Sequence, residues 1–96
     1  MSTVMVVAKI LAKQEKIELV KTELLKLIEP TRKDDGCIKY NLLQNNDAPE
    51  LFFFCEEWRD EDALEKHLKT EHINNYLKAT EGCVEEFVVN KNTLIS

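Results

Sequence analysis

The chain has 96 residues, of which 44% are hydrophobic and 32% are charged, and its net charge is −5 at pH 7. This composition is typical of one globular domain, which we place at residues 1–96, and it excludes a disordered chain. The acidic balance is unsuited to nucleic acid, and no apolar run reaches the roughly 20 residues that cross a bilayer. The N-terminus shows no basic region ahead of its apolar part, so we expect a cytoplasmic protein without a membrane partner.

Residues 3–12 are predicted to form a strand covered on both sides, because apolar residues occupy both alternating positions. From Gln14 the apolar spacing becomes helical, which predicts about four turns with one inward stripe. The stripe consists of Ile17, Val20, Leu24, Leu27 and Ile28. Pro30 and the turn sequence at residues 34–36 predict the end of this helix.

Two strands joined by a turn are predicted next. Residues 37–45 alternate, with Ile38, Tyr40 and Leu42 on one face, and the Asn, Asp and Pro content that follows predicts a hairpin turn. In residues 51–58 an unbroken apolar run requires a cover for both faces. The two faces hold Leu51, Phe53 and Cys55 on one side and Phe52, Phe54, Glu56 and Trp58 on the other.

Asp60 is the predicted N-cap of a second helix, and a break near Thr70 separates a further short helical piece. The residues expected to face inward are Ala63, Leu64, His67 and Leu68, followed by Ile73, Tyr76 and Leu77. Residues 83–95 are predicted to form the last strand. Its faces are expected to hold Val84 and Val88 on one side and Phe87 and Val89 on the other.

The three cysteines, Cys37, Cys55 and Cys83, form no CxxC pair, so we expect free thiols rather than a disulfide or a zinc site. The two glycines in the chain are too few for a glycine-rich phosphate loop.

The order β-α-β-β-α-β predicts an α+β, ferredoxin-like fold in which both helices cover one face of a four-stranded antiparallel sheet. The other face would expose more apolar surface than a monomer normally tolerates. We therefore expect a homodimer in which a second subunit covers that face under two-fold symmetry.

The chain resembles the antibiotic biosynthesis monooxygenase domain, the group of quinol-monooxygenase-like proteins. The pattern E-x-W, A-L and H-x(4)-H matches Glu56, Trp58, Ala63, Leu64, His67 and His72, and G-C-x-x-Y matches Gly36, Cys37 and Tyr40. The resemblance implies a dimeric α+β barrel with a pocket between sheet and helices in each subunit. Members include cofactor-free oxygenases of hydroquinones and anthrones, an isomerase of a phosphorylated signalling sugar, and haem-degrading enzymes. Residues 3–12 lack the Asn of the haem-degrading branch, so haem is not expected.

His67 and His72 are the catalytic candidates. On one continuous helix they would lie about 140° apart, but a break at Thr70 could bring both towards one pocket. A neutral imidazole at position 67 suits a general base, because its ordinary pKa lies near physiological pH. The alternative for His67 is a structural core histidine, and for His72 a solvated position in the first turn of the short helix.

The predicted substrate-binding residues are Glu56, Trp58, Tyr40, Tyr76, Phe54 and Leu64. A glutamate in an apolar row needs a partner or a raised pKa. Trp58 could instead join sheet to helix, and the tyrosines could be ordinary amphipathic core residues. We expect the row with Glu56 and Trp58 to face the pocket. No HxH or HExxH spacing is present, so neither a metal nor a cofactor is predicted.

These features predict a cofactor-independent monooxygenase of a small aromatic diol or quinol, in which His67 deprotonates a phenolic hydroxyl and the anion reacts with dioxygen. One alternative is an isomerase of a small phosphorylated carbonyl compound, for which Arg59, Lys66 and Lys69 would be the nearby cations. Another is a non-catalytic dimer that binds a small ligand.

Overall fold

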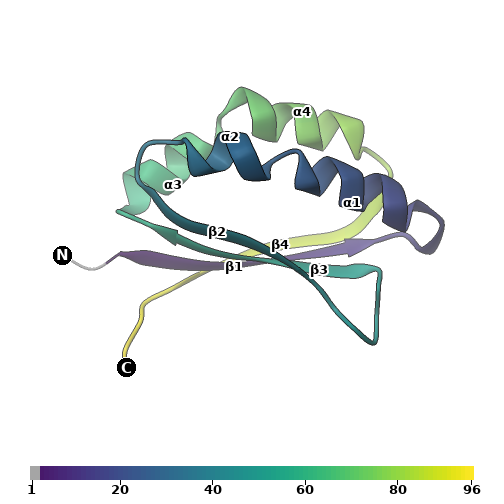
Figure 1. Ribbon diagram of the computed structural model, residues 1–96, viewed down its shortest axis with the longest axis horizontal. Coiled ribbons are helices and arrows are strands. Elements are labelled where there is room, and N and C mark those ends of the chain that lie inside the picture. Colours follow the sequence, from purple (N-terminus) through teal and green to yellow (C-terminus); the bar gives the residue numbers. More distant parts are fainter. Residues whose placement is uncertain (1–2) are drawn as a thin grey trace.

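The computed structural model describes residues 3–96, which form an α+β, ferredoxin-like fold. The elements are β1 (Val4–Ala12), the 3-10 turn η1 (Gln14–Lys16), α1 (Ile17–Leu25), α2 (Ile28–Arg32), β2 (Cys37–Gln44), β3 (Leu51–Trp58), α3 (Glu61–Leu68), α4 (Glu71–Ala79) and β4 (Val84–Asn92). The strands form one antiparallel sheet in the order β2-β3-β1-β4. All the helices lie on one face of this sheet (Figure 1), as the order of predicted elements required. None of the helices within residues 3–96 is long and apolar enough to cross a membrane.

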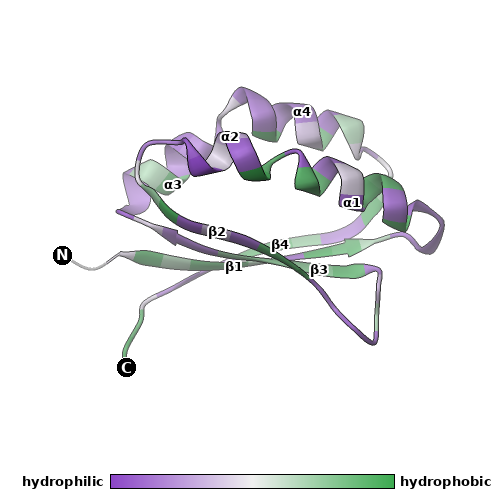
Figure 2. Cartoon of the chain, in the orientation of Figure 1, coloured by the Kyte–Doolittle hydropathy of each residue, from purple (hydrophilic) through white to green (hydrophobic). Residues whose placement is uncertain are grey.

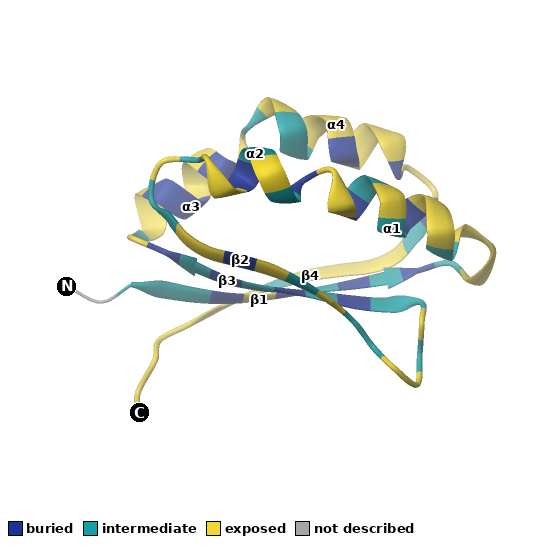
Figure 3. Cartoon of the chain, in the orientation of Figure 1, coloured by how far each residue is buried: buried dark blue, intermediate teal, exposed yellow. Residues whose placement is uncertain are grey.

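The two rows of β3 differ in burial and so identify which face the helices cover. The four side chains that are no more than 6% exposed are those of Phe52, Phe54, Glu56 and Trp58. The residues between them are only half-buried, and Figure 3 shows the resulting alternation along the central strands. Because β1 pairs with β3 residue by residue, its buried Val6, Ala8 and Ile10 lie on the same face. The row that contains Glu56 and Trp58 therefore faces the helices.

Irregularities in strand pairing correct two predicted faces. The register shifts between Cys37 and Lys39, so Cys37 pairs with Trp58 and packs against the core, while Ile38 is 55% exposed. A second shift on β1 places Val84 opposite Ala12 and against the core, away from the half-exposed Val88. An extra residue in one strand reverses the side on which the following side chains lie, which alternation alone could not reveal.

The predicted first helix is divided rather than continuous. The amide of Leu27 bonds to the carbonyl of Leu24 at 3.1 Å, in the tighter 3-10 manner, and α2 then runs through Pro30 to Arg32. The turn at residues 34–36 does follow the end of the helical region at Arg32, as predicted. Pro30 itself does not end a helix, because it lies in the first turn of α2, where its missing N–H has no intrahelical partner to lose.

The break at Thr70 is confirmed and has a clear local cause. The Thr70 hydroxyl donates to the His67 carbonyl at 2.7 Å, and it accepts from the amide of Ile73 at 3.4 Å. One side chain thus ends α3 and caps α4. The Asp60 carboxylate caps α3 by accepting from the amide of Ala63 at 2.9 Å, as predicted.

Two residues predicted to face inward do not lie in the core. Leu68 and Leu77 are 38% and 46% exposed, whereas Ala63, Leu64, His67 and Tyr76 are buried. Figure 2 shows apolar segments of the helices facing the sheet and polar segments facing away. Leu68 and Leu77 instead border the cavity between helices and sheet. The cysteines are free thiols, and among them Cys83 is buried while Cys37 and Cys55 are half-buried.

Candidate active site

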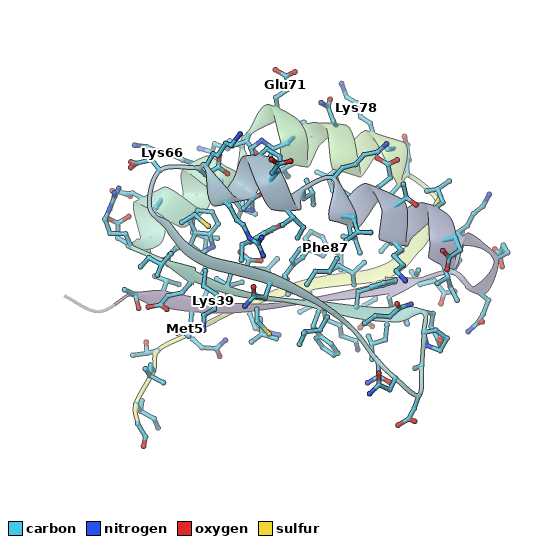
Figure 4. All side chains as sticks on the ribbon, viewed as in Figure 1. Met5, Lys39, Lys66, Glu71, Lys78 and Phe87 are labelled. Atoms are coloured by element: carbon cyan, nitrogen blue, oxygen red, sulfur yellow. The ribbon has the colours of Figure 1, made fainter. Side chains whose placement is uncertain are left out.

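A cavity of about 110 Å³ lies between the helices and the sheet. Its walls are mostly apolar and come from β1, β2, β3, β4, α1, α3 and α4. Its lining residues include Tyr40, Phe54, Glu56, Leu64, His67 and Tyr76. Leu68, Leu77 and Phe87 also line it, and each of them is between 38% and 47% exposed, so they form its open side. Figure 4 shows Phe87 in the space between sheet and helices, while Lys66, Glu71 and Lys78 project outward from the helices.

Glu56 places a carboxyl group on this apolar wall. Its side chain is 6% exposed, and its Oε1 atom accepts a hydrogen bond of 2.8 Å from Nε1 of Trp58. Burial raises the pKa of Glu56 from 4.5 to about 7, against the opposing effect of the Trp58 hydrogen bond. At neutral pH the group is therefore divided between acid and carboxylate, which suits it to give or accept a proton.

His67 is held on α3 with one ring nitrogen engaged and the other unengaged. Its Nδ1 atom lies 3.0 Å from Oδ2 of Asp34, and Nε2 forms no hydrogen bond within residues 3–96. A carboxylate accepts hydrogen bonds, so in the neutral imidazole this pairing puts the proton on Nδ1 and leaves a lone pair on Nε2. His67 also lines the cavity. Burial lowers the pKa of His67, against the raising effect of Asp34. The neutral form required of a base is thus favoured.

His72 reaches the same carboxylate from α4. Its Nε2 atom is 3.0 Å from Oδ2 of Asp34, and its ring centroid is 6.0 Å from that of His67. The break at Thr70 brings both histidines to one acceptor. However, His72 does not line the cavity between helices and sheet; it borders a separate hollow with Glu23, Lys26 and Asn75.

Asp34 is the site residue that the sequence analysis missed. Its amide donates to the Thr31 carbonyl at 2.9 Å, and its carbonyl accepts from the Cys37 amide at 3.1 Å, which fixes the turn after α2. Gly36 follows with φ +84°, and a Cβ there would lie 2.5 Å from the Cβ of Ala63. This close approach of turn and helix places Asp34 beside His67. In the sequence this turn marks only the end of a helix, and no local pattern links Asp34 to His67 or His72, which lie 33 and 38 positions later.

The aromatic residues differ in their relation to the cavity. Tyr40 stacks on Phe54 with ring centroids 4.5 Å apart and meets the edge of His67 at 5.6 Å. Burial raises the pKa of Tyr40 and raises that of Tyr76 to about 12, so both hydroxyl groups remain protonated donors. Trp58 is fully buried behind this wall, 4.6 Å from the His67 ring, and does not line the cavity. Its part in the site is therefore to hold Glu56 and to support His67.

The basic residues near α3 lie outside the cavity. Arg59 pairs with Asp35 at 3.1 Å and with Asp60 at 3.4 Å on the surface, and Lys66 and Lys69 are exposed. Among residues 3–96, no lysine or arginine lines the cavity between helices and sheet. The cavity therefore presents acid, imidazole and phenol groups but no fixed positive charge.

The family model described as antibiotic biosynthesis monooxygenase matches residues 3–79. The chain belongs to this family. A relative of this chain, "Putative monooxygenase Rv0793" from Mycobacterium tuberculosis, is 35% identical over 75 residues, which are 78% of this chain and 73% of that protein. "Uncharacterized protein sll1783" from Synechocystis is 33% identical over 66 residues, which cover 69% of this chain but only 42% of that longer protein.

The fold of this antibiotic biosynthesis monooxygenase family member is also found in solved structures. The crystal structure of PA3566 from Pseudomonas aeruginosa superposes with a TM-score of 0.95 at 29% identity, covering 100% of this chain and 97% of that one. A second structure, titled "Crystal structure of antibiotic biosynthesis monooxygenase", superposes with a TM-score of 0.90 at 29% identity, covering 97% of this chain and 99% of that one. Family membership supports a monooxygenase-like activity in general and leaves the substrate to the residues of the cavity.

Proposed function

We propose that the protein is a cofactor-independent monooxygenase of a small aromatic diol. The observation that carries this proposal is the pairing of Asp34 with Nδ1 of His67, which leaves Nε2 as a base at an apolar cavity. In the proposed reaction Nε2 takes the proton of a phenolic hydroxyl, and the electron-rich anion reacts directly with dioxygen. One oxygen atom enters the ring and the other leaves as water, so a hydroquinone becomes a hydroxyquinone and no external reductant is needed.

The cavity supports a substrate with a single ring. Its volume of about 110 Å³ is of the same order as the ~150 Å³ engineered cavity that holds benzene in another protein. Phe54 and Leu64 supply flat and aliphatic walls, while Glu56 and Tyr40 could bind the second hydroxyl group of a diol. Exclusion of water by these walls would protect a reactive anion from side reactions.

The two alternative functions make different demands on the cavity. An isomerase of a phosphorylated compound requires cationic groups for the phosphate, and Arg59, Lys66 and Lys69 lie outside the cavity. A non-catalytic dimer without a ligand would be favoured by a space filled with side chains, whereas this cavity is lined but not filled. A non-catalytic dimer that binds a small ligand there would show no dioxygen uptake above the autoxidation rate.

The test is dioxygen uptake by chelator-treated protein with a panel of one-ring and two-ring hydroquinones. We expect uptake above the autoxidation rate for one-ring substrates, and mass spectrometry with ¹⁸O₂ should find one labelled oxygen atom in the product. His67→Ala should lose about 10²- to 10⁴-fold in kcat/KM. His67→Asn should lose as much, although its amide group can still donate a hydrogen bond to Asp34, because it has no basic nitrogen. Lys66→Ala, one residue away and exposed, is the matched control.

Uptake no faster than autoxidation across the panel would refute the proposal. Full uptake by both His67 variants would refute the role of His67 as the base. Release of hydrogen peroxide with no labelled product would indicate an oxidase instead.

A further inference from the structure

Asp34, His67 and His72 form a group of three potential metal ligands at the junction of the α2–β2 turn, α3 and α4. The atoms Oδ2 of Asp34, Nδ1 of His67 and Nε2 of His72 all lie within 4.8 Å of one another. We propose that these three side chains bind a divalent transition-metal ion of the first row, such as Zn²⁺. The sequence spacing predicted no metal site, because the carboxylate comes from a turn 33 residues before His67.

The distances between the donor atoms suit such an ion. Both histidine nitrogens lie 3.0 Å from Oδ2 of Asp34. With metal–ligand bonds of about 2.0–2.1 Å, neighbouring ligand atoms are about 2.9 Å apart at right angles and about 3.4 Å apart at tetrahedral angles. The two nitrogen–oxygen separations fall within that range. The two nitrogens lie within 4.8 Å of each other, so a small side-chain movement is enough to bring both to one ion.

The chemical types of the three ligand groups, and their exposure to solvent, also suit a transition-metal ion. Two imidazoles and one carboxylate on one side of an ion leave further positions open, an arrangement used by zinc and by non-haem iron. The His67 side chain is 2% exposed, whereas those of Asp34 and His72 are 19% and 21% exposed. One ligand is therefore held rigidly by the core, and the other two give an ion access from solvent. The hydrogen bonds of Thr70 and of the turn at Asp34 fix the backbone on either side of the site before an ion binds.

Occupation of this site would change the proposed active site through a shift of one proton. A neutral imidazole that binds a metal through Nδ1 must carry its proton on Nε2. Nε2 of His67 would then be a donor and could not take a proton from a substrate. This consequence rests on the proposed function, whereas metal binding itself does not.

The binding test is a calorimetric titration of the folded wild-type chain with Zn²⁺, repeated with Co²⁺, whose visible absorption reports its ligands. We expect one ion per chain, with affinity at least about tenfold lower in Asp34→Asn and in His72→Gln. Asp35→Asn is the matched control, because it removes the adjacent carboxylate, which is 75% exposed and pairs with Arg59. Circular dichroism checks that each variant folds. His72→Gln is the safer of the two, because Asp34 is also the hydrogen-bond partner of the buried His67 ring.

Absence of a saturable site in the wild type would overturn the proposal and leave a hydrogen-bonded cluster only. Equal affinities in Asp34→Asn, His72→Gln and Asp35→Asn would overturn it as well, since binding would then lie elsewhere. In a second arm, Zn²⁺ should suppress dioxygen uptake and a chelator should restore it. Uptake that continues at saturating Zn²⁺ would overturn the proton shift. If no uptake occurs without metal, the proposed function fails while the titration still decides the metal site.

Discussion

Replacement of Glu56 by glutamine measures what the fold loses by burying this carboxyl group. Glutamine has nearly the same shape and keeps an Oε1 acceptor for Nε1 of Trp58, which donates to Glu56 at 2.8 Å. It cannot ionise. The pH dependence of the difference in stability between variant and wild type therefore reports the ionisation of Glu56, because the other titrating groups are common to both proteins.

The sign and size of the effect follow from the raised pKa. Burial raises the pKa of Glu56 from 4.5 to about 7, so the folded state favours the protonated form. The stability contributed by that form is fully present below pH 4.5 and is lost as the pH rises through about 7. At about 1.4 kcal/mol for each pH unit between the two pKa values, the loss is about 3 kcal/mol by pH 8.

The assay is urea unfolding followed by circular dichroism between pH 4 and pH 8.5 at one protein concentration. Relative to its value at pH 4, the difference in unfolding free energy should move in favour of Glu56→Gln by up to about 3 kcal/mol at pH 8. Glu57→Gln removes the same charge from the opposite, half-buried side of β3 and serves as the control. A difference that stays constant with pH, or that moves in favour of the wild type, would refute the reasoning.

Three further predictions concern the turn, the helix break and the free face of the sheet. Gly36→Ala should destabilise the protein more than Gly82→Ala in urea unfolding. Both glycines have positive φ, but a Cβ added at Gly36 would lie 2.5 Å from the Cβ of Ala63, whereas one added at Gly82 would meet nothing within 4 Å. We expect a loss of about 1–2 kcal/mol for Gly82→Ala and about 1–3 kcal/mol more for Gly36→Ala, and equal losses would contradict this. Thr70→Ala should cost about 1 kcal/mol in the same assay and Thr70→Ser much less, since serine keeps the capping oxygen; equal losses in the two variants would show that the cap is not the cause. We expect a homodimer through the sheet face opposite the helices, where Val7 is 39% exposed, so sedimentation should give about twice the chain mass of 11.2 kDa for the wild type and a lighter species for Val7→Lys. A stable wild-type monomer at micromolar concentration would rule out this dimer.

Several features of the fold are determined locally and were predictable from the sequence. The order of elements follows from apolar periodicities, because a period of two or of about 3.6 residues is fixed by backbone geometry. The capping roles of Asp60 and Thr70 are likewise local, since each hydroxyl or carboxylate bonds to an amide three residues later. The presence of apolar residues on both faces of β3 is also visible in the sequence, although alternation alone could not decide which face meets the helices.

Other features depend on how distant segments pack. Pro30 is compatible either with the end of a helix or with the first turn of another, and the irregular backbone between α1 and α2 selected the second. The bulges beside Cys37 and Val84 arise in pairing with neighbouring strands, and they reverse the faces expected from alternation. Leu68 and Leu77 have the spacing of core residues but border an open cavity, because the helices do not close over β4.

The sequence by itself determined the topology, the helix break between the two histidines and the apolar character of both faces of β3, because these depend on neighbours along the chain. The tertiary structure decided that Glu56 faces a cavity, that His72 lies outside it, and that Asp34 meets both imidazoles at 3.0 Å. Those contacts join residues more than 30 positions apart. They exist because the turn at Gly36 approaches α3 more closely than any side chain would allow, and sequence spacing carries no information about such an approach.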